Sequence, residues 1–314
     1  MKKFRVFVAA ILVLSYCGSP QAATFTENFS SDPLQNDWKT FGDANLFRWN
    51  AAGQNLAVTW DSSQTNSYFY HSLGTILARD DDFALEFDLN LTDATAGAYG
   101  SELGIGFLNI ATATSPDFLR SLGTSPNVAE FDYFPPSQIA ASIDATLIDA
   151  SNNFYFTFNT APLDPGVTYH VRIAHAAGDP NLSGEVFTNG VLYAALTNSY
   201  PSTMADFRLD AIAISSYQDD GFGDTVLAHG TVGNLVATLP PPPVQNLAGS
   251  FSNGTWQVQF NERTNWLFTL ERSTDLVSWT NVSPATAGAP NVLTLQDTNA
   301  PTGNAFYRVR AERP

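Results

Sequence analysis

Cysteine is almost absent from this chain of 314 residues. The single cysteine, Cys17, lies close to the N-terminus, so the rest of the chain cannot form a disulfide bond. A zinc site built on cysteine thiolates is excluded for the same reason. Stability must therefore come from buried apolar surface, for which 44% hydrophobic and 13% aromatic residues provide ample material.

Basic residues are also scarce. The chain has 14 lysines and arginines against 30 aspartates and glutamates, which gives a formal net charge of −16. Such a surface repels phosphate backbones and anionic lipids, so a role at nucleic acids or at a membrane surface is disfavoured. The acidity favours solubility and divalent cations, but it does not by itself indicate a function.

Long hydrophobic runs are absent, since no stretch approaches the roughly 20 apolar residues of a membrane span. Residues 1–23 instead fit a signal peptide. A short basic start precedes the apolar run 6–14, and residues 19–23 provide small side chains for cleavage. We therefore predict a secreted or cell-surface protein. Lipid attachment at Cys17 is disfavoured because the bulky Tyr16 precedes it.

A run of four prolines at 240–243 divides the chain. Consecutive prolines favour a stiff polyproline II spacer, which has no backbone donors for a sheet. We predict a large domain at 24–238, a linker at 239–244 and a small domain at 245–314.

Helical periodicity is nearly absent, and short segments alternate between apolar and polar residues instead. Residues 83–91 place phenylalanine and leucine on one face and acidic or amide side chains on the other, which predicts a strand with one buried face. Asn189-Gly190 is typical of a type I′ hairpin turn. Further strands of the large domain are predicted at 103–110, 128–134, 154–158, 169–174, 185–187, 209–215 and 235–237. Those of the small domain are predicted at 255–260, 266–272, 278–280, 293–295 and 305–310. Many short strands without long helices predict an all-β fold, a sandwich or jelly roll.

The order of these features in residues 24–238 resembles the concanavalin A-like lectin and glucanase superfamily, in its secreted bacterial type. The segments that carry the resemblance are 27–29 with Trp38, 83–91, 104–107, 163–171 and 230–235. The resemblance implies a concanavalin A-like β-sandwich and a carbohydrate ligand. Residues 268–280 and 306–311 resemble an accessory β module of fibronectin type, which implies attachment, spacing or adhesion.

Glu130 and Asp132 are the most informative local match to that superfamily. Legume-type lectins carry a similar Glu-Phe-Asp on a strand beside their calcium and manganese sites, and laminarinase-type glycosidases carry Glu-x-Asp-x-x-Glu. The position of the final glutamate, which is the acid/base in those enzymes, is Pro135 here. A retaining glycosidase needs two carboxyl groups, one nucleophilic and one protonated. The substitution therefore disfavours catalysis by Glu130 and Asp132.

Two interpretations of this strand remain open. Glu130, Asp132 and the aromatic Tyr133 could bind a ligand, because sugar faces stack on aromatic rings. The two carboxylates could equally form an ordinary polar face. Trp38, Trp49 and Trp60 likewise fit either a sugar platform or core packing.

A glycine-rich loop near residue 220 provides a candidate metal site. Asp219, Asp220 and Asp224 could supply the oxygen ligands that calcium prefers, although the spacing is not that of an EF-hand and a solvated acidic loop is the alternative. The sequence thus predicts a non-catalytic carbohydrate-binding protein with calcium as a possible cofactor. The alternatives are a glycoside hydrolase and a structural or adhesive protein.

Overall fold

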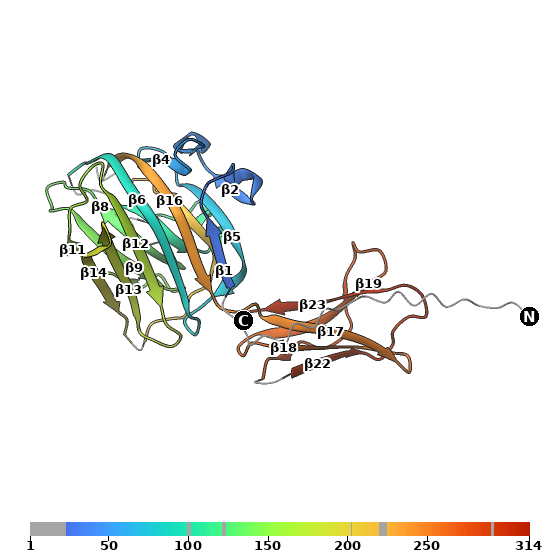
Figure 1. The fold of residues 1–314 in the computed structure, drawn as a ribbon. Helices are drawn as coiled ribbons and strands as arrows, with labels where there is room; N and C mark the ends of the chain where they lie inside the picture. The colour runs from blue at the N-terminus through green and yellow to red at the C-terminus, as the bar shows by residue number, and fades with distance from the viewer. Residues whose placement is uncertain (1–22, 99–101, 121–123, 202, 220–224, 290–291) are drawn as a thin grey trace, which may run out of the picture. The chain divides into compact units, whose positions relative to one another are not determined.

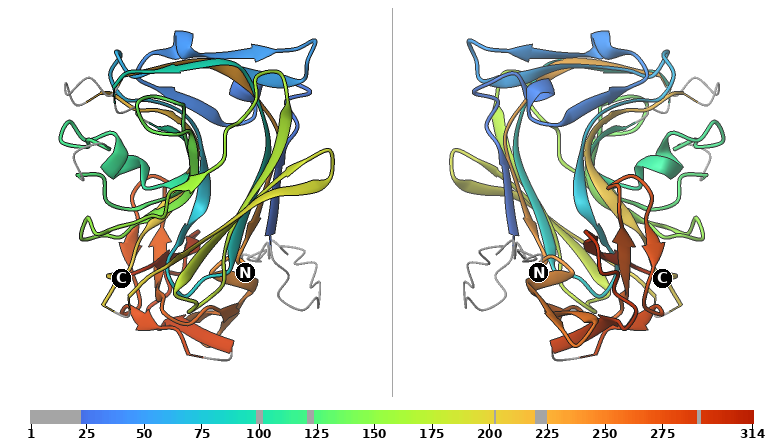
Figure 2. Two further views of the ribbon diagram at one scale, coloured as in Figure 1. Left: turned by 90° about the vertical axis from the view of Figure 1, so that its left-hand side faces the viewer. Right: turned by 90° about the vertical axis from the view of Figure 1, so that its right-hand side faces the viewer.

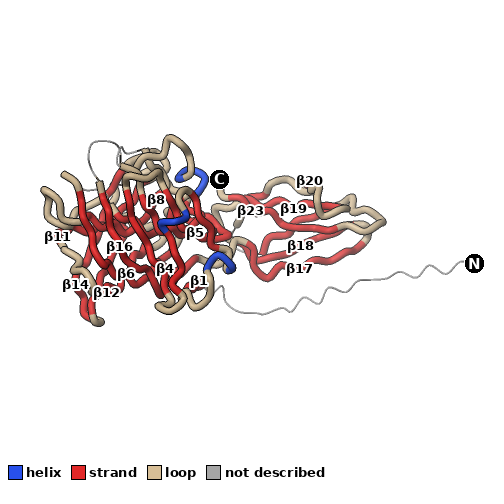
Figure 3. Tube along the Cα trace, turned by 90° about the horizontal axis from the view of Figure 1, so that it is seen from above, coloured by secondary structure: helices blue, strands red, loops and turns tan. Residues whose placement is uncertain are grey.

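The computed structural model describes residues 23–98, 102–120, 124–201, 203–219, 225–289 and 292–314. The chain forms two compact units, Ala22–Pro240 and Pro241–Pro314. Strands make up nearly all of the regular structure in both units (Figures 1 and 3). The predicted signal peptide lies outside the described residues, except for Ala23, with which the first strand begins. Among the described residues, none belongs to a helix long and apolar enough to cross a membrane.

The large unit consists of two antiparallel sheets, which we call sheet A and sheet B. Sheet A has the order β14-β13-β12-β6-β16-β4-β3, with β1 beside β16. Its strands are β1 (Ala23–Glu27), β3 (Phe47–Asn50), β4 (Asn55–Asp61), β6 (Phe83–Ala96), β12 (Thr168–His175), β13 (Asn181–Thr188), β14 (Val191–Ser199) and β16 (Val226–Leu239).

Sheet B has the order β10-β9-β8-β7-β15-β5-β2, with β11 beside β9. Its strands are β2 (Trp38–Phe41), β5 (Ser67–Leu77), β7 (Leu103–Leu108), β8 (Val128–Phe134), β9 (Ser142–Ile148), β10 (Phe154–Tyr155), β11 (Asn159–Thr160) and β15 (Leu209–Ser216). Among the described residues, the helices are three single turns, η1 (Pro33–Gln35), η2 (Ala44–Leu46) and α1 (Ile110–Ala113).

The main hydrophobic core lies between the two sheets, which curve around it (Figure 2). Apolar side chains at alternate positions of the strands fill this core. For example, the ring centroids of Phe87 in β6 and Phe131 in β8 are 6.0 Å apart. Trp38 and Trp60 are buried in this core, as expected of packing residues. The arrangement confirms the predicted fold class, an all-β jelly-roll sandwich followed by a small β-sandwich.

A second apolar cluster covers the outer face of sheet B. It joins Leu108, Val128 and Tyr217 of the sheet region to Ala113 and Phe118 of the segment that follows β7. That segment therefore lies on the sheet and places Arg120 over β8.

The small unit has two sheets of its own. One has the order β17-β18-β22; in the other, β19 pairs with β20, β21 and β23. The strands are β17 (Val244–Ser252), β18 (Thr255–Glu262), β19 (Leu267–Ser273), β20 (Thr280–Asn281), β21 (Thr286–Ala287), β22 (Val292–Asp297) and β23 (Phe306–Glu312). Phe260 and Phe268 meet in its core at 5.2 Å between ring centroids.

Most predicted strands are present within a few residues, and Asn189 and Gly190 have the positive φ of the predicted hairpin turn. One predicted strand was too long, and several observed strands, β5, β9 and β17 among them, were not predicted. The predicted strand 154–158 ends after Tyr155, and residues 156–158 leave the sheet. No strand was predicted where β9 forms, although Ile143, Ala145 and Leu147 alternate into the core.

Candidate binding site

Glu130 and Asp132 lie on the face of β8 that points away from the main core. They are 1% and 0% exposed, because the segment ending at Arg120 covers them. The paired strand β7 makes room with two glycines: Gly104 lies opposite Asp132 and Gly106 opposite Glu130. A Cβ at Gly104 would lie 2.6 Å from Glu130 Oε2, which is closer than such contacts occur. The buried carboxylate of Glu130 therefore leaves room only for glycine at position 104.

Arg120 is the cation that these carboxylates hold. Its Nε donates to Glu130 Oε1 at 2.9 Å, and its Nη2 donates to Asp132 Oδ2 at 2.7 Å. Glu102 Oε1 lies 3.4 Å from the same Nε. Tyr217 completes the cluster, since its hydroxyl donates to Glu130 Oε2 at 2.6 Å. One guanidinium thus faces three carboxylates in a buried environment.

The electrostatics of this cluster favour retention of a proton. Burial raises the pKa of Asp132 well above its usual range, and the neighbouring Glu130 raises it further. Burial raises the pKa of Glu130 as well, against the opposing effect of Arg120. A single positive charge cannot compensate all the nearby carboxylates, so the pair binds a proton more readily than isolated side chains.

A metal ion does not fit between Glu130 and Asp132, because the Arg120 guanidinium already lies there as their cation. In the described parts of the chain, no three histidine, cysteine, aspartate or glutamate side chains gather as a metal site would require. Asp219 is half-buried, with its backbone N–H bonded to Ser62. Asp220 and Asp224 lie outside the described residues, so the calcium loop stays a prediction.

The same geometry bears on the glycosidase alternative. A carboxyl group that attacks or protonates a sugar must reach the glycosidic bond. Glu130 and Asp132 instead lie beneath the side chain of Arg120 and are bonded to it. Tyr133, the third predicted ligand residue, points into the core between the sheets, where its hydroxyl accepts a bond from Leu163 N.

Next to this cluster, a pocket of about 280 Å³ opens at the surface of sheet B. We call it the phenylalanine pocket. Its lining consists of four phenylalanines around a polar floor: Phe134, Phe154, Phe156 and Phe158 with Glu102, Arg120 and Thr146. The sequence predicted strands at 128–134 and 154–158, where these phenylalanines lie, with Phe134 as an aromatic neighbour of Glu130 and Asp132 that favours a binding site; it did not predict a pocket among the four rings.

The four rings contact one another edge to face. The ring centroids of Phe134 and Phe158 are 5.0 Å apart, and those of Phe158 and Phe156 are also 5.0 Å apart. Phe154 lies 6.2 Å from Phe156 and covers the guanidinium of Arg120, whose Cζ is 4.7 Å from its centroid. The aromatic wall and the ionic cluster are therefore one continuous structure.

Asp144 holds the part of this wall that leaves the sheet. This buried carboxylate on β9 accepts a hydrogen bond from Thr157 N at 3.0 Å and another from Asn198 Nδ2 at 3.0 Å. Thr157 stands between Phe156 and Phe158, so its anchored backbone fixes the positions of both rings. The N–H group of Thr157 thus bonds the side chain of Asp144 and not a backbone carbonyl of β9, where residues 156–158 leave the sheet.

Comparisons with known proteins assign no family. No family model matches the sequence, and no curated protein matches it. Among solved structures, peanut lectin with a nine-residue peptide has a TM-score of 0.46 and 11% identity, covering 71% of this chain and 100% of that chain. Lectin UEA-II complexed with galactose has a TM-score of 0.48 and 12% identity, covering 69% and 98%. Alginate lyase Aly36B has a TM-score of 0.39 and 11% identity, covering 69% and 97%. At such low identities and TM-scores, the similarity assigns no activity to this chain.

Proposed function

We propose that the large unit binds a neutral carbohydrate at the phenylalanine pocket, without catalysing a reaction on it. The observation that carries this proposal is the exposure of Phe156 and Phe158, which are 47% and 56% exposed although their backbone is anchored. Exposed aromatic rings that gather at a pocket mark a binding surface.

The chemistry of the pocket suits a sugar ring. The faces of phenylalanine rings carry partial negative charge, which attracts the polarised C–H groups on the apolar face of a sugar. Hydroxyl groups at the edge of that sugar need polar partners, which the floor supplies through Thr146, Glu102 and Arg120. The volume of about 280 Å³ lies near the lower end of the range for ligand pockets, about 300 Å³, and suits a single sugar unit.

The charge of the floor favours a neutral ligand over a uronate. Arg120 is surrounded by Glu102, Glu130 and Asp132, so the cluster remains negative even when one carboxyl group is protonated. A sugar carboxylate placed there would be repelled, and the net charge of −16 adds to this repulsion.

The position of the carboxylates disfavours catalysis. Arg120 covers Glu130 and Asp132 and holds them in ion pairs, so a bound sugar meets the guanidinium before it meets either carboxyl group. Secretion and a supporting calcium ion belong to the same proposal, on the basis of residues 1–23 and of Asp219, Asp220 and Asp224.

Binding to an array of neutral and uronate oligosaccharides tests the proposal, followed by calorimetry with the neutral sugar that binds best. Phe156→Ala and Phe158→Ala remove exposed rings, so the fold should persist while affinity falls about tenfold for the pair. Leu34→Ala is the control, since Leu34 is equally exposed in the same unit but lies in η1.

Unchanged affinity in Phe156→Ala and Phe158→Ala, or binding to uronates alone, would contradict the proposal. No binding to any glycan would favour the structural or adhesive alternative. Release of reducing ends from the bound sugar would overturn the non-catalytic part. A chelator added to the same array tests calcium, because a metal-supported site loses its signal.

A further inference from the structure

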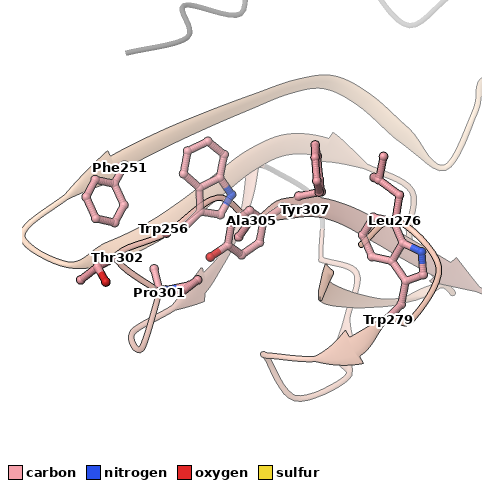
Figure 4. Close-up of a pocket in the computed structure, with 11 residues that line it drawn as sticks. Phe251, Trp256, Leu276, Trp279, Pro301, Thr302, Ala305 and Tyr307 are labelled. Carbon is pink, nitrogen blue, oxygen red and sulfur yellow. The ribbon is translucent and has the colours of Figure 1, made fainter. Parts of the chain in front are cut away.

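The small unit contains a larger groove, which the proposed function does not use. It has a volume of about 660 Å³, well inside the range of about 300 to 1,000 Å³ for ligand sites. In the view of Figure 4, Phe251 lies at one end, Trp256 near the middle, and Trp279 with Leu276 at the other end. We call this the tryptophan groove.

The middle of the groove is built around Trp256. Its ring stacks on Tyr307, with centroids 5.0 Å apart and an angle of 17° between the planes. Strand β17 leaves space for the indole at Gly249, where a Cβ would lie only 2.6 Å from Trp256 Cζ2. The Tyr307 hydroxyl donates to buried Asp297, which also accepts from Arg272 Nη1 at 2.7 Å. Both rings are thus held in place before any ligand arrives.

The far end is fixed through a second buried carboxylate. Arg308 lies over Trp279, with its Cζ 4.2 Å from the ring centroid. Its Nε donates to Glu271 at 2.7 Å, and Glu271 is almost completely buried. This chain of contacts immobilises an indole that would otherwise move freely on a surface loop. Fixed aromatic side chains lose little entropy on binding, which raises the affinity of a site.

The described residues that line the groove carry no charge. No aspartate, glutamate, lysine or arginine lines the described groove, although the whole chain has a net charge of −16. The exposed rings of Phe251 and Phe306 border it, and Thr302 supplies a hydroxyl group. An uncharged ligand with flat apolar faces and polar edges complements this surface, and a row of rings suits a ligand that repeats along its length.

We propose that the tryptophan groove is a second carbohydrate-binding site, which takes the apolar faces of consecutive units of a neutral sugar chain. The site belongs to the small unit alone. It does not depend on the phenylalanine pocket, and either site can fail without the other.

Nuclear magnetic resonance of the isotope-labelled full chain can test the groove separately. The chain has six tryptophans, and no described lining residue of the phenylalanine pocket is a tryptophan. The indole N–H signals of Trp256 and Trp279 therefore report the groove and not the phenylalanine pocket. The probes are hexasaccharides of glucose in β-1,3 and β-1,4 linkage, of xylose and of mannose, with a hexauronate as the anionic probe. We expect the signals of Trp256 and Trp279 to shift with at least one neutral probe. Trp266 serves as an internal control, since it is buried and should not shift.

Variants complete the experiment. Phe251→Ala removes an exposed ring and should weaken binding about three- to tenfold, while Phe251→Trp should restore it. The shifts should persist in the Phe156→Ala, Phe158→Ala chain, which separates this site from the first. No shift with any neutral probe at millimolar concentration would overturn the proposal. So would a stronger response to the hexauronate, or shifts that follow protein concentration without sugar, which would assign the groove to a second copy of the chain.

Discussion

At the scale of single residues, Arg120 decides what the predicted motif can do. The pair Glu130 and Asp132 has the spacing that places two carboxylates on one face of a strand. In this protein an arginine from the connection between β7 and β8 occupies the space between them. A buried charge without a partner would cost several kcal/mol, so removal of the arginine alone would leave an unstable cluster of carboxylates.

The proton held by this cluster should appear in the pH dependence of stability. The pKa of Asp132 is raised in the folded protein, so the folded state binds a proton at pH values where the unfolded chain, with its ordinary value of 3.8, has lost it. The contribution of this group to stability is therefore present at low pH and declines as pH rises from 3.8 through the raised pKa. Each pH unit in that interval lowers the free energy of unfolding by up to about 1.4 kcal/mol. Asp132→Asn should remove this slope.

Urea denaturation of the protein and of Asp132→Asn over about pH 4 to about pH 8 measures the effect. The stability of the protein relative to the variant should fall as the pH rises. A difference between the two that stays constant over this range would contradict the raised pKa.

The sequence indicated two carboxylates of this cluster, but it did not indicate which residue pairs with them. Glu130 and Asp132 could be placed on one face because alternation along a strand is a local property. Arg120 reaches them through the fold of a loop, and nothing in the neighbouring residues indicates that a single arginine will be buried. Gly104 and Gly106 could have indicated the buried cluster, since glycine inside a strand often marks a place where another group approaches the backbone closely.

At the scale of elements, the segment after β10 shows where alternation is ambiguous. Phe154, Phe156 and Phe158 alternate with other residues, as in a strand that buries one face. The same pattern fits a row of rings at a pocket, because alternation fixes which side chains share a side and not what lies on that side. The two-sheet sandwich was predictable because most alternating segments do face the core. The pocket was not, since it depends on a hydrogen bond between residues 13 apart, Asp144 and Thr157.

We expect Asp144→Ala to loosen this segment. The change leaves Thr157 N without its buried acceptor, which costs about 1–3 kcal/mol, whereas Asn198 Nδ2 keeps its bonds to the carbonyl oxygens of Ala145 and Tyr155. Amide exchange at Thr157 should become faster, and sugar affinity at the phenylalanine pocket should fall several-fold because Phe156 and Phe158 are no longer fixed. Asp144→Asn keeps one carbonyl acceptor and should lie between the two. Amide exchange at Thr157 that is as slow in Asp144→Ala as in the unchanged chain would contradict this role.

At the scale of the whole molecule, the chain carries two proposed sugar sites on two units joined by four prolines, 240–243. A short oligosaccharide fills one site at a time. A long polymer offers many equivalent positions, so once one site is bound, the linker keeps the other at a high effective concentration near the same polymer. Two weak sites then act as one stronger binding unit.

Both sites should therefore contribute to the affinity for a polymer, whereas each site binds a short sugar by itself. With a hexasaccharide, Phe158→Ala should affect only the phenylalanine pocket and Phe251→Ala only the tryptophan groove. With an insoluble polymer of the same sugar, either substitution should lower the apparent affinity by about the factor measured at its own site, because the affinity of a two-site complex follows the product of the two site affinities. The double variant should lose most of the binding. Sedimentation of the full chain with the polymer measures these affinities, with Leu34→Ala as the control. A polymer affinity that stays nearly unchanged when one site is weakened would mean that the two sites do not engage one chain together, because the intact site alone would then account for the binding.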